Sequence, residues 1–130
     1  MKKILLTVLF IFLIEGCSQK TVVHNVTLEE HILSTLEDGD EIDLNELTDF
    51  TWDTAYLFTP YTTQESINKH LGVTFKDPSN IDHRDDIFLL IFMEGGDVIQ
   101  YAEISREHGD LSVVDGMEIK PEKAMLKVEN

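Results

Sequence analysis

The sequence predicts an α+β domain in which two amphipathic helices pack on one face of an antiparallel sheet of about four strands. Two segments, 27–38 and 62–71, carry apolar residues at helical spacing and are each followed by a glycine. A third segment, 87–104, holds an unbroken apolar run, a tight turn and a second apolar run, a pattern typical of a β-hairpin. No internal repeat or low-complexity segment interrupts these elements.

The first helix is expected over Thr27–Asp38. Thr27 and Glu30 have the spacing of a capping box, in which a hydroxyl and a carboxylate bind reciprocal backbone N–H groups. Gly39 follows as the expected C-terminal stop. The apolar residues three and four positions apart, which form one helical face, are Leu28, Ile32, Leu33 and Leu36.

The acidic stretch Asp38–Asp43 is predicted to be a solvated turn. It lacks the glycine that an EF-hand calcium loop requires at its sixth position. Ile42, Leu44 and Leu47 then fit either a short extended piece or one loose helical turn, and the pattern does not separate the two.

A strand is predicted over Phe50–Tyr61, because aromatic residues suit a half-buried pleated surface and Pro60 cannot donate to a ladder. Alternation places Phe50, Trp52, Tyr56 and Phe58 on one face, and Asp53, Ala55 and Leu57 on the other. Asp53 is expected to hydrogen-bond a neighbouring loop.

The second helix is expected over Thr62–Leu71, with capping residues at its start and Gly72 at its end. A turn-rich loop then leads to the hairpin of Ile87–Met93 and Val98–Ile104. The unbroken apolar run of the first hairpin strand requires cover on both faces, and the sequence leaves open what covers the second.

Three further pieces complete the domain. Leu111–Val114 is predicted to be a strand, and Met117–Ile119 is expected to pair at a sheet edge. Glu122–Asn130 fits either a final short strand or a frayed tail.

Residues 1–17 have the organisation of a secretory signal. Lys2 and Lys3 precede the apolar run Ile4–Ile14, which is shorter than the roughly 20 residues of a spanning helix. Cys17 closes the stretch and is the only cysteine of the chain, so no disulfide framework is expected.

The end of this stretch resembles the lipobox of bacterial lipoproteins, through Ile14, Gly16 and Cys17. Glu15 departs from that pattern, in which a charge directly before the glycine is unusual. The resemblance implies that Cys17 carries a diacylglyceryl group and becomes the new N-terminus. It also implies anchoring to the cell membrane or outer membrane, facing outside the cytoplasm. The run from Trp52 to Thr62 resembles small uncharacterised bacterial lipoproteins, a likeness that implies no function.

The expected organisation is a signal peptide at 1–16, a lipidated cysteine and tether at 17–26, and a single domain at 27–130. The full chain has a formal net charge of −15. Removal of the signal takes away two lysines and one glutamate, so the mature chain is more acidic by one unit. Such a field repels nucleic acid and is compatible with a basic protein partner, or with solubility alone.

Four residues are candidates for binding, each with a structural alternative. Trp52 and Tyr61 belong to an aromatic cluster that serves either the core or a recognition surface. Arg84 and Arg106 are the only arginines, and they either bind a ligand or pair locally with carboxylates. No catalytic residue, metal site or cofactor is predicted, because no two histidines have the spacing of a helical zinc site.

The favoured function is therefore that of a non-enzymatic envelope lipoprotein, anchored through Cys17, that binds a partner with a basic surface. An anchored inhibitor of a basic toxin is a special case of it. The alternative is a small hydrolase or metal-binding enzyme that uses the carboxylates and histidines of the loops Asp77–Asp86 and Ser105–Asp110.

Overall fold

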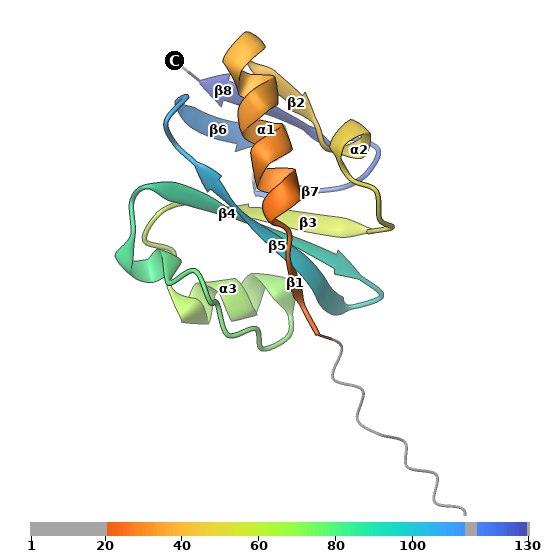
Figure 1. Cartoon of the computed structure of the whole chain (residues 1–130). Coiled ribbons are helices and arrows are strands. Elements are labelled where there is room, and N and C mark those ends of the chain that lie inside the picture. The colour runs from red at the N-terminus through yellow and green to blue at the C-terminus, as the bar shows by residue number, and fades with distance from the viewer. Residues whose placement is uncertain (1–20, 114–116, 130) are drawn as a thin grey trace, which may run out of the picture.

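The computed structural model describes residues 21–113 and 117–129, and its fold class is α+β, as predicted (Figure 1). The signal segment and Cys17 lie outside the described residues. No helix in the described ranges is both long and apolar enough to cross a membrane. The elements are β1 (Val23–His24), α1 (Val26–Asp38), β2 (Glu41–Asp43), α2 (Leu44–Leu47), β3 (Thr54–Phe58), α3 (Gln64–Leu71), the 3-10 helix η1 (Ile81–His83), β4 (Ile87–Glu94), β5 (Asp97–Ser105), β6 (Asp110–Val113), β7 (Glu118–Ile119) and β8 (Met125–Glu129).

The larger sheet has five strands in the order β1-β5-β4-β3-β7. The predicted hairpin is confirmed as β4 and β5, and its turn uses Gly95 and Gly96 at φ 61° and 86°, a region that glycine enters without strain. β7 pairs with β3 at the sheet edge, as expected. β1 pairs with β5 in the parallel sense, with Val23 opposite Gln100, so these residues of the expected tether belong to the sheet.

A second sheet of three strands, in the order β2-β8-β6, corrects the prediction of one sheet with about four strands. The C-terminal segment is a strand, and β8 lies at the centre of this sheet. The residues that the sequence left open also divide here, because Ile42 belongs to β2 while Leu44 and Leu47 belong to α2. The pairing of β8 with β2 could not be predicted from the sequence, because the two strands are far apart in the chain and no local pattern encodes their contact.

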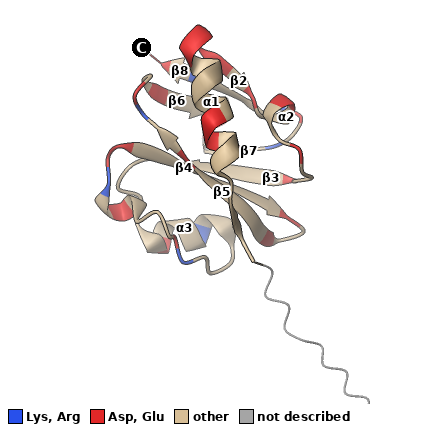
Figure 2. Cartoon of the chain, viewed as in Figure 1, with Lys and Arg blue, Asp and Glu red and all other residues tan. Residues whose placement is uncertain are grey.

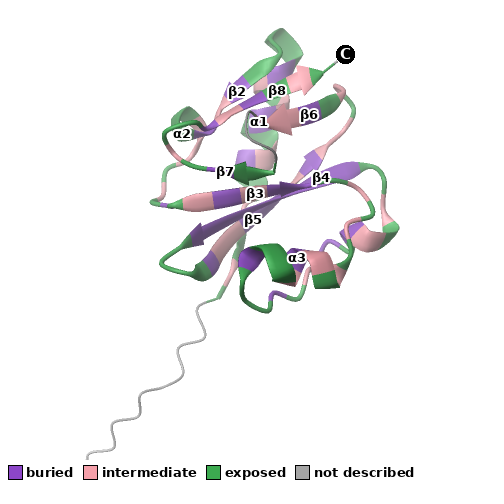
Figure 3. Ribbon diagram, turned by 180° about the vertical axis from the view of Figure 1, so that it is seen from behind, coloured by how far each residue is buried: buried purple, intermediate pink, exposed green. Residues whose placement is uncertain are grey.

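The two main helices cover opposite faces of the larger sheet, which corrects the expectation that both pack on one face. Phe88, Leu90 and Phe92 of β4 join a core with α1 and the three-stranded sheet. Alternate β4 residues, Leu89, Ile91 and Met93, join a second core with α3. This arrangement gives the unbroken apolar strand its cover on both sides, and every residue from Ile87 to Met93 is buried (Figure 3).

The predicted helices are confirmed, with one change of cap. Asn25 caps α1, because its side chain accepts a hydrogen bond from the Leu28 N–H, so Thr27 lies inside the helix. α3 begins after the cap Thr63 and ends at Gly72, which has φ 76°. Leu28, Ile32 and Leu36 are buried as expected, while Leu33 is half-buried.

The aromatic strand is shorter than predicted and its face assignment is partly wrong. Only Thr54–Phe58 forms β3, so the alternation does not extend back to Trp52. Tyr56 and Phe58 lie on the α3 side, but Trp52 packs with Ala55 and Leu57 in the other core. Asp53 makes the expected loop contact, since its carboxylate accepts from the Gly95 N–H at 2.8 Å.

Candidate functional site

The loops 77–86 and 105–110, which the sequence paired as an alternative enzyme site, do adjoin. The Arg106 N–H donates to the Asp86 carbonyl at 3.1 Å, and the Arg106 guanidinium donates to the Asp85 carbonyl. Both loops therefore meet where β4 begins and β5 ends. Several of their polar groups are bound within the loops, as the contacts of the two arginines show, whereas the buried Nε2 of His108 has no hydrogen-bond partner among the described residues.

Arg84 is held by two carboxylates, one from the loop before β4 and one from β5. Its guanidinium donates to both oxygens of Asp86 at 2.9 Å and to Glu103 at 3.1 Å, and also to the Ser79 carbonyl at 3.1 Å. The hydrogen bonds from Arg84 hold the pKa of the Asp86 carboxyl below its usual range, and those to Asp86 raise the pKa of Arg84. Of the two roles that the sequence allows for Arg84, the structure therefore shows pairing with carboxylates.

Arg106 has the same structural character. It donates to the Asp110 carboxylate at 2.7 Å and 3.0 Å, and its guanidinium carbon lies 5.7 Å from the centre of the Phe88 ring. The side chain therefore closes the end of one core while it ties the 105–110 loop to Asp85.

The carboxylate of Asp77 shapes its own loop. It accepts hydrogen bonds from the Ser79 N–H and hydroxyl and from the Ile81 N–H, which positions η1. The Asp77 N–H in turn donates to the Gln64 side chain, so the loop is fastened to α3. This carboxylate is occupied by backbone and side-chain donors of its own segment.

The two aromatic candidates are not brought together. Trp52 is only 6% exposed, and its indole N–H donates to the Thr48 hydroxyl at 3.2 Å, so it is a core residue. Tyr61 is 59% exposed and has φ 67°, which is unusual for a residue other than glycine. Its N–H donates to the Ile81 carbonyl at 3.0 Å, so the backbone is fixed while the ring points to solvent.

A polar cluster around His24 was missed by the sequence reading. His24 Nε2 donates to Glu29 at 2.6 Å and lies 4.0 Å from Glu103, and its ring stacks on Tyr101 at 4.5 Å. Glu29 also accepts from the Glu103 N–H at 2.7 Å. Burial, with the nearby charges of Glu103, Asp77 and Glu29, raises the pKa of Tyr101. No local motif marks this cluster, because its members come from β1, α1 and β5.

Charge is segregated along the chain, and this signal is visible in the sequence once the segments are compared. No lysine or arginine occurs between residues 21 and 68. In the structure this stretch forms β1, α1, β2, α2, β3 and most of α3. Acidic residues also lie elsewhere, for example at the β4–β5 turn, but most of those in this stretch lie on or beside α1, β2 and α2 (Figure 2). We call the exposed members of this set the acidic face: Glu30, Glu37, Asp38, Asp40, Glu41, Glu46 and Asp49.

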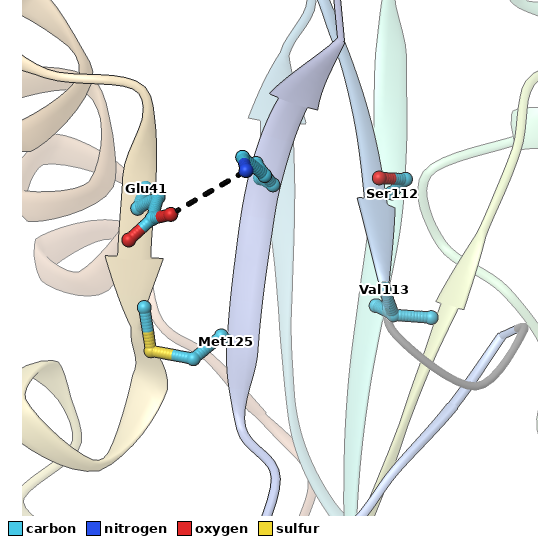
Figure 4. Close-up of a pocket in the computed structure, with 5 residues that line it drawn as sticks. Glu41, Ser112, Val113 and Met125 are labelled. Atoms are coloured by element: carbon cyan, nitrogen blue, oxygen red, sulfur yellow. Dashed lines mark ion pairs between the residues drawn. The ribbon is translucent and has the colours of Figure 1, made fainter.

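Two shallow hollows accompany the acidic face. One, of about 390 Å³, lies between α1 and α2 and is lined in part by His31, Glu46 and Asp49. The other, also about 390 Å³, lies on the outer side of the three-stranded sheet between Met125 and Val113 (Figure 4). Glu41 and Lys127 line it as an ion pair at 3.7 Å.

Metal binding has no evident centre in residues 21–113 and 117–129, where no group of three histidine, cysteine or acidic side chains is arranged to hold an ion. The chain has no match among protein-family models, curated proteins or solved structures.

Proposed function

We propose that this protein is a lipid-anchored, non-enzymatic binding protein of the bacterial envelope, whose partner presents a basic surface. The anchor is Cys17, and the binding surface is the acidic face. The observation that carries the binding proposal is the absence of any lysine or arginine from residues 21–68, which leaves the acidic face uncompensated along its own segment.

The anchor rests on the order of residues at the N-terminus. Lys2 and Lys3, a short apolar run, Gly16 and Cys17 match the pattern of a lipoprotein signal in every respect but Glu15. Two acyl chains hold a protein stably in a bilayer, because each buried methylene contributes about 0.8 kcal/mol.

The exposure of the acidic face supports a role in recognition by charge. Long-range attraction speeds the encounter with an oppositely charged protein and favours it over acidic competitors. The alternative enzyme site gains less support, because the side chains of Asp77, Arg84 and Arg106 are bound within their own loops and to β5.

The anchor is tested by the intact mass of the protein extracted from membranes. We expect the mass of residues 17–130 plus a diacylglyceryl group, with or without one further acyl chain. A mass equal to the whole chain would mean that Glu15 prevents processing. A Cys17→Ser protein that still fractionates with membranes and keeps the mass pattern of the wild type would contradict lipid anchoring.

The binding surface is tested by chemical crosslinking in envelope preparations, with two charge-reversed proteins. In the first, Glu30, Glu37, Asp38 and Glu46 are changed to lysine. In the matched control, four acidic residues outside the acidic face are changed to lysine instead: Glu65, Asp85, Glu94 and Glu107. Both variants therefore have the same net charge.

We expect the wild type and the control to crosslink a basic protein at low salt and to lose it as salt screens the attraction. The first variant should lose the crosslinked protein at every salt concentration. Equal loss in both variants would show that net charge, and not the acidic face, governs binding.

A further inference from the structure

The place where the chain leaves the domain fixes which end of the molecule meets the membrane. β1 runs parallel to β5, so the chain before Val23 runs toward the start of β5 and the turn at Gly95 and Gly96. Val22 packs against the core that holds Ile67 and Leu71 of α3. The exit end of the domain is therefore formed by β1, α3 and the β4–β5 turn.

The acidic face lies toward the end of the domain opposite the exit end. Figures 1 and 3 both place the three-stranded sheet and the C-terminal end of α1 at the far end of the molecule from β1. α1 begins on β5 and reaches β2, and its 13 residues span about 20 Å of that separation. Asp38 at the end of α1 is thus remote from the point where the chain leaves.

The connection between lipid and domain is short. Five residues separate Cys17 from Val23, and even a fully extended chain covers at most about 3.6 Å per residue, or roughly 20 Å in all. A domain of this size has a diameter of roughly 35 Å by the usual scaling of chain length with radius. The connection is therefore too short to let the domain turn over and bring its far end to the lipid.

We infer that the anchored domain stands on the bilayer surface on its β1–α3 end, with the three-stranded sheet and the C-terminal half of α1 directed away from the membrane. The inference rests on the proposed anchoring at Cys17. The orientation holds the acidic face away from the headgroups, whereas the exposed Glu65 and Glu94 of the exit end lie near them. A partner therefore reaches the acidic face from the side opposite the membrane.

The test uses the lipidated full-length protein in vesicles whose headgroups carry an energy-transfer acceptor. Lipidation occupies the only native cysteine, so one introduced cysteine takes a donor dye selectively. Glu94→Cys places the dye on the exit end and Asp38→Cys on the far end, and both positions are exposed. Intact mass confirms the diacylglyceryl group in each sample before the measurement.

We expect energy transfer from position 94 to exceed that from position 38 about twofold or more, because the two ends differ in height by most of the domain's diameter. Insertion of about 30 glycine and serine residues after Ser18 should abolish the difference, because such a linker lets the domain turn freely. Lipidated protein with equal transfer from both positions overturns the orientation alone. Protein without the diacylglyceryl group overturns the anchor and the orientation together.

Discussion

Single side chains divide here into those whose role follows from their type and those whose role depends on distant neighbours. The pairing of Arg84 and Arg106 with carboxylates could be anticipated, because arginine is scarce and acid abundant in this chain. The position of Trp52 could not, because alternation fails where residues 51–53 leave the strand. His24 was overlooked for a related reason, since Glu103 is remote in sequence.

Tyr61 has a backbone that suits glycine and an exposed side chain that adds little to the core. We expect Tyr61→Gly to be more stable than Tyr61→Ala by roughly 1 kcal/mol, because only glycine enters this region without strain. Urea unfolding of the two variants measures the difference. Equal stabilities would show that the Tyr61 backbone relaxes when the ring is removed.

The Arg84–Asp86 pair predicts a pH dependence of stability. The folded state lowers the pKa of Asp86, so its contribution is present above the unfolded value of about 3.9 and is lost as the pH falls through the folded value. Asp86→Asn should therefore lower the free energy of unfolding at pH 7, and the deficit should shrink as the pH falls below about 4.

The measurement is urea unfolding across that pH range. The matched control is Asp85→Asn, an exposed neighbour that contacts Arg106 through its backbone carbonyl. A deficit for Asp86→Asn that stays constant with pH would contradict the ionic origin of the effect.

At the scale of elements, local signals were sufficient and long-range pairing was not. The stop at Gly72 and the turn after Glu94 are encoded by a few adjacent residues, and both were predicted. The division into two sheets depends on β8 pairing with β2 and β6, which no neighbouring residue encodes. The capping-box spacing at Thr27 predicts a cap two residues after the actual cap, Asn25.

Asn25 joins α1 to the larger sheet as well as capping the helix. It accepts from the Leu28 N–H and donates to the Gln100 side chain at 2.7 Å. Asn25→Ala should lower the free energy of unfolding by about 1–2 kcal/mol, through loss of the cap and of this second hydrogen bond. Asn25→Asp keeps the cap and should lose less than half as much in the same chemical denaturation experiment. Equal losses of stability in the two variants would show that the helix cap is not the source of the effect.

On the scale of the whole molecule, the dominant property is uncompensated negative charge, which was evident from composition. What composition did not reveal is its concentration on α1, β2 and α2, because that requires the fold to gather one segment at one end. The negative charge of the candidate surface could thus be predicted from the sequence, but its location in the fold could not. Mutual repulsion within the acidic face opposes folding, since like charges are brought closer than in the unfolded chain.

Salt should therefore stabilise the domain. Between low ionic strength and about 0.5 M sodium chloride we expect Tm to rise by several degrees, because screening shortens the reach of the repulsion to a few ångströms. The variant with Glu30, Glu37, Asp38 and Glu46 changed to lysine should respond less, since it removes half of the net charge of residues 17–130. Calorimetry of both proteins measures this, and identical salt responses would exclude repulsion within the acidic face as the cause.

The parallel pairing of β1 with β5 also decides how the domain withstands pulling forces. Tension applied through the N-terminus acts along the axis of β1, so the pairing with Gln100 and Tyr101 and the Asn25–Tyr101 hydrogen bond are loaded together, in shear. If the protein is anchored through Cys17 as we propose, tension from the anchor therefore loads these hydrogen bonds at once and not one after another.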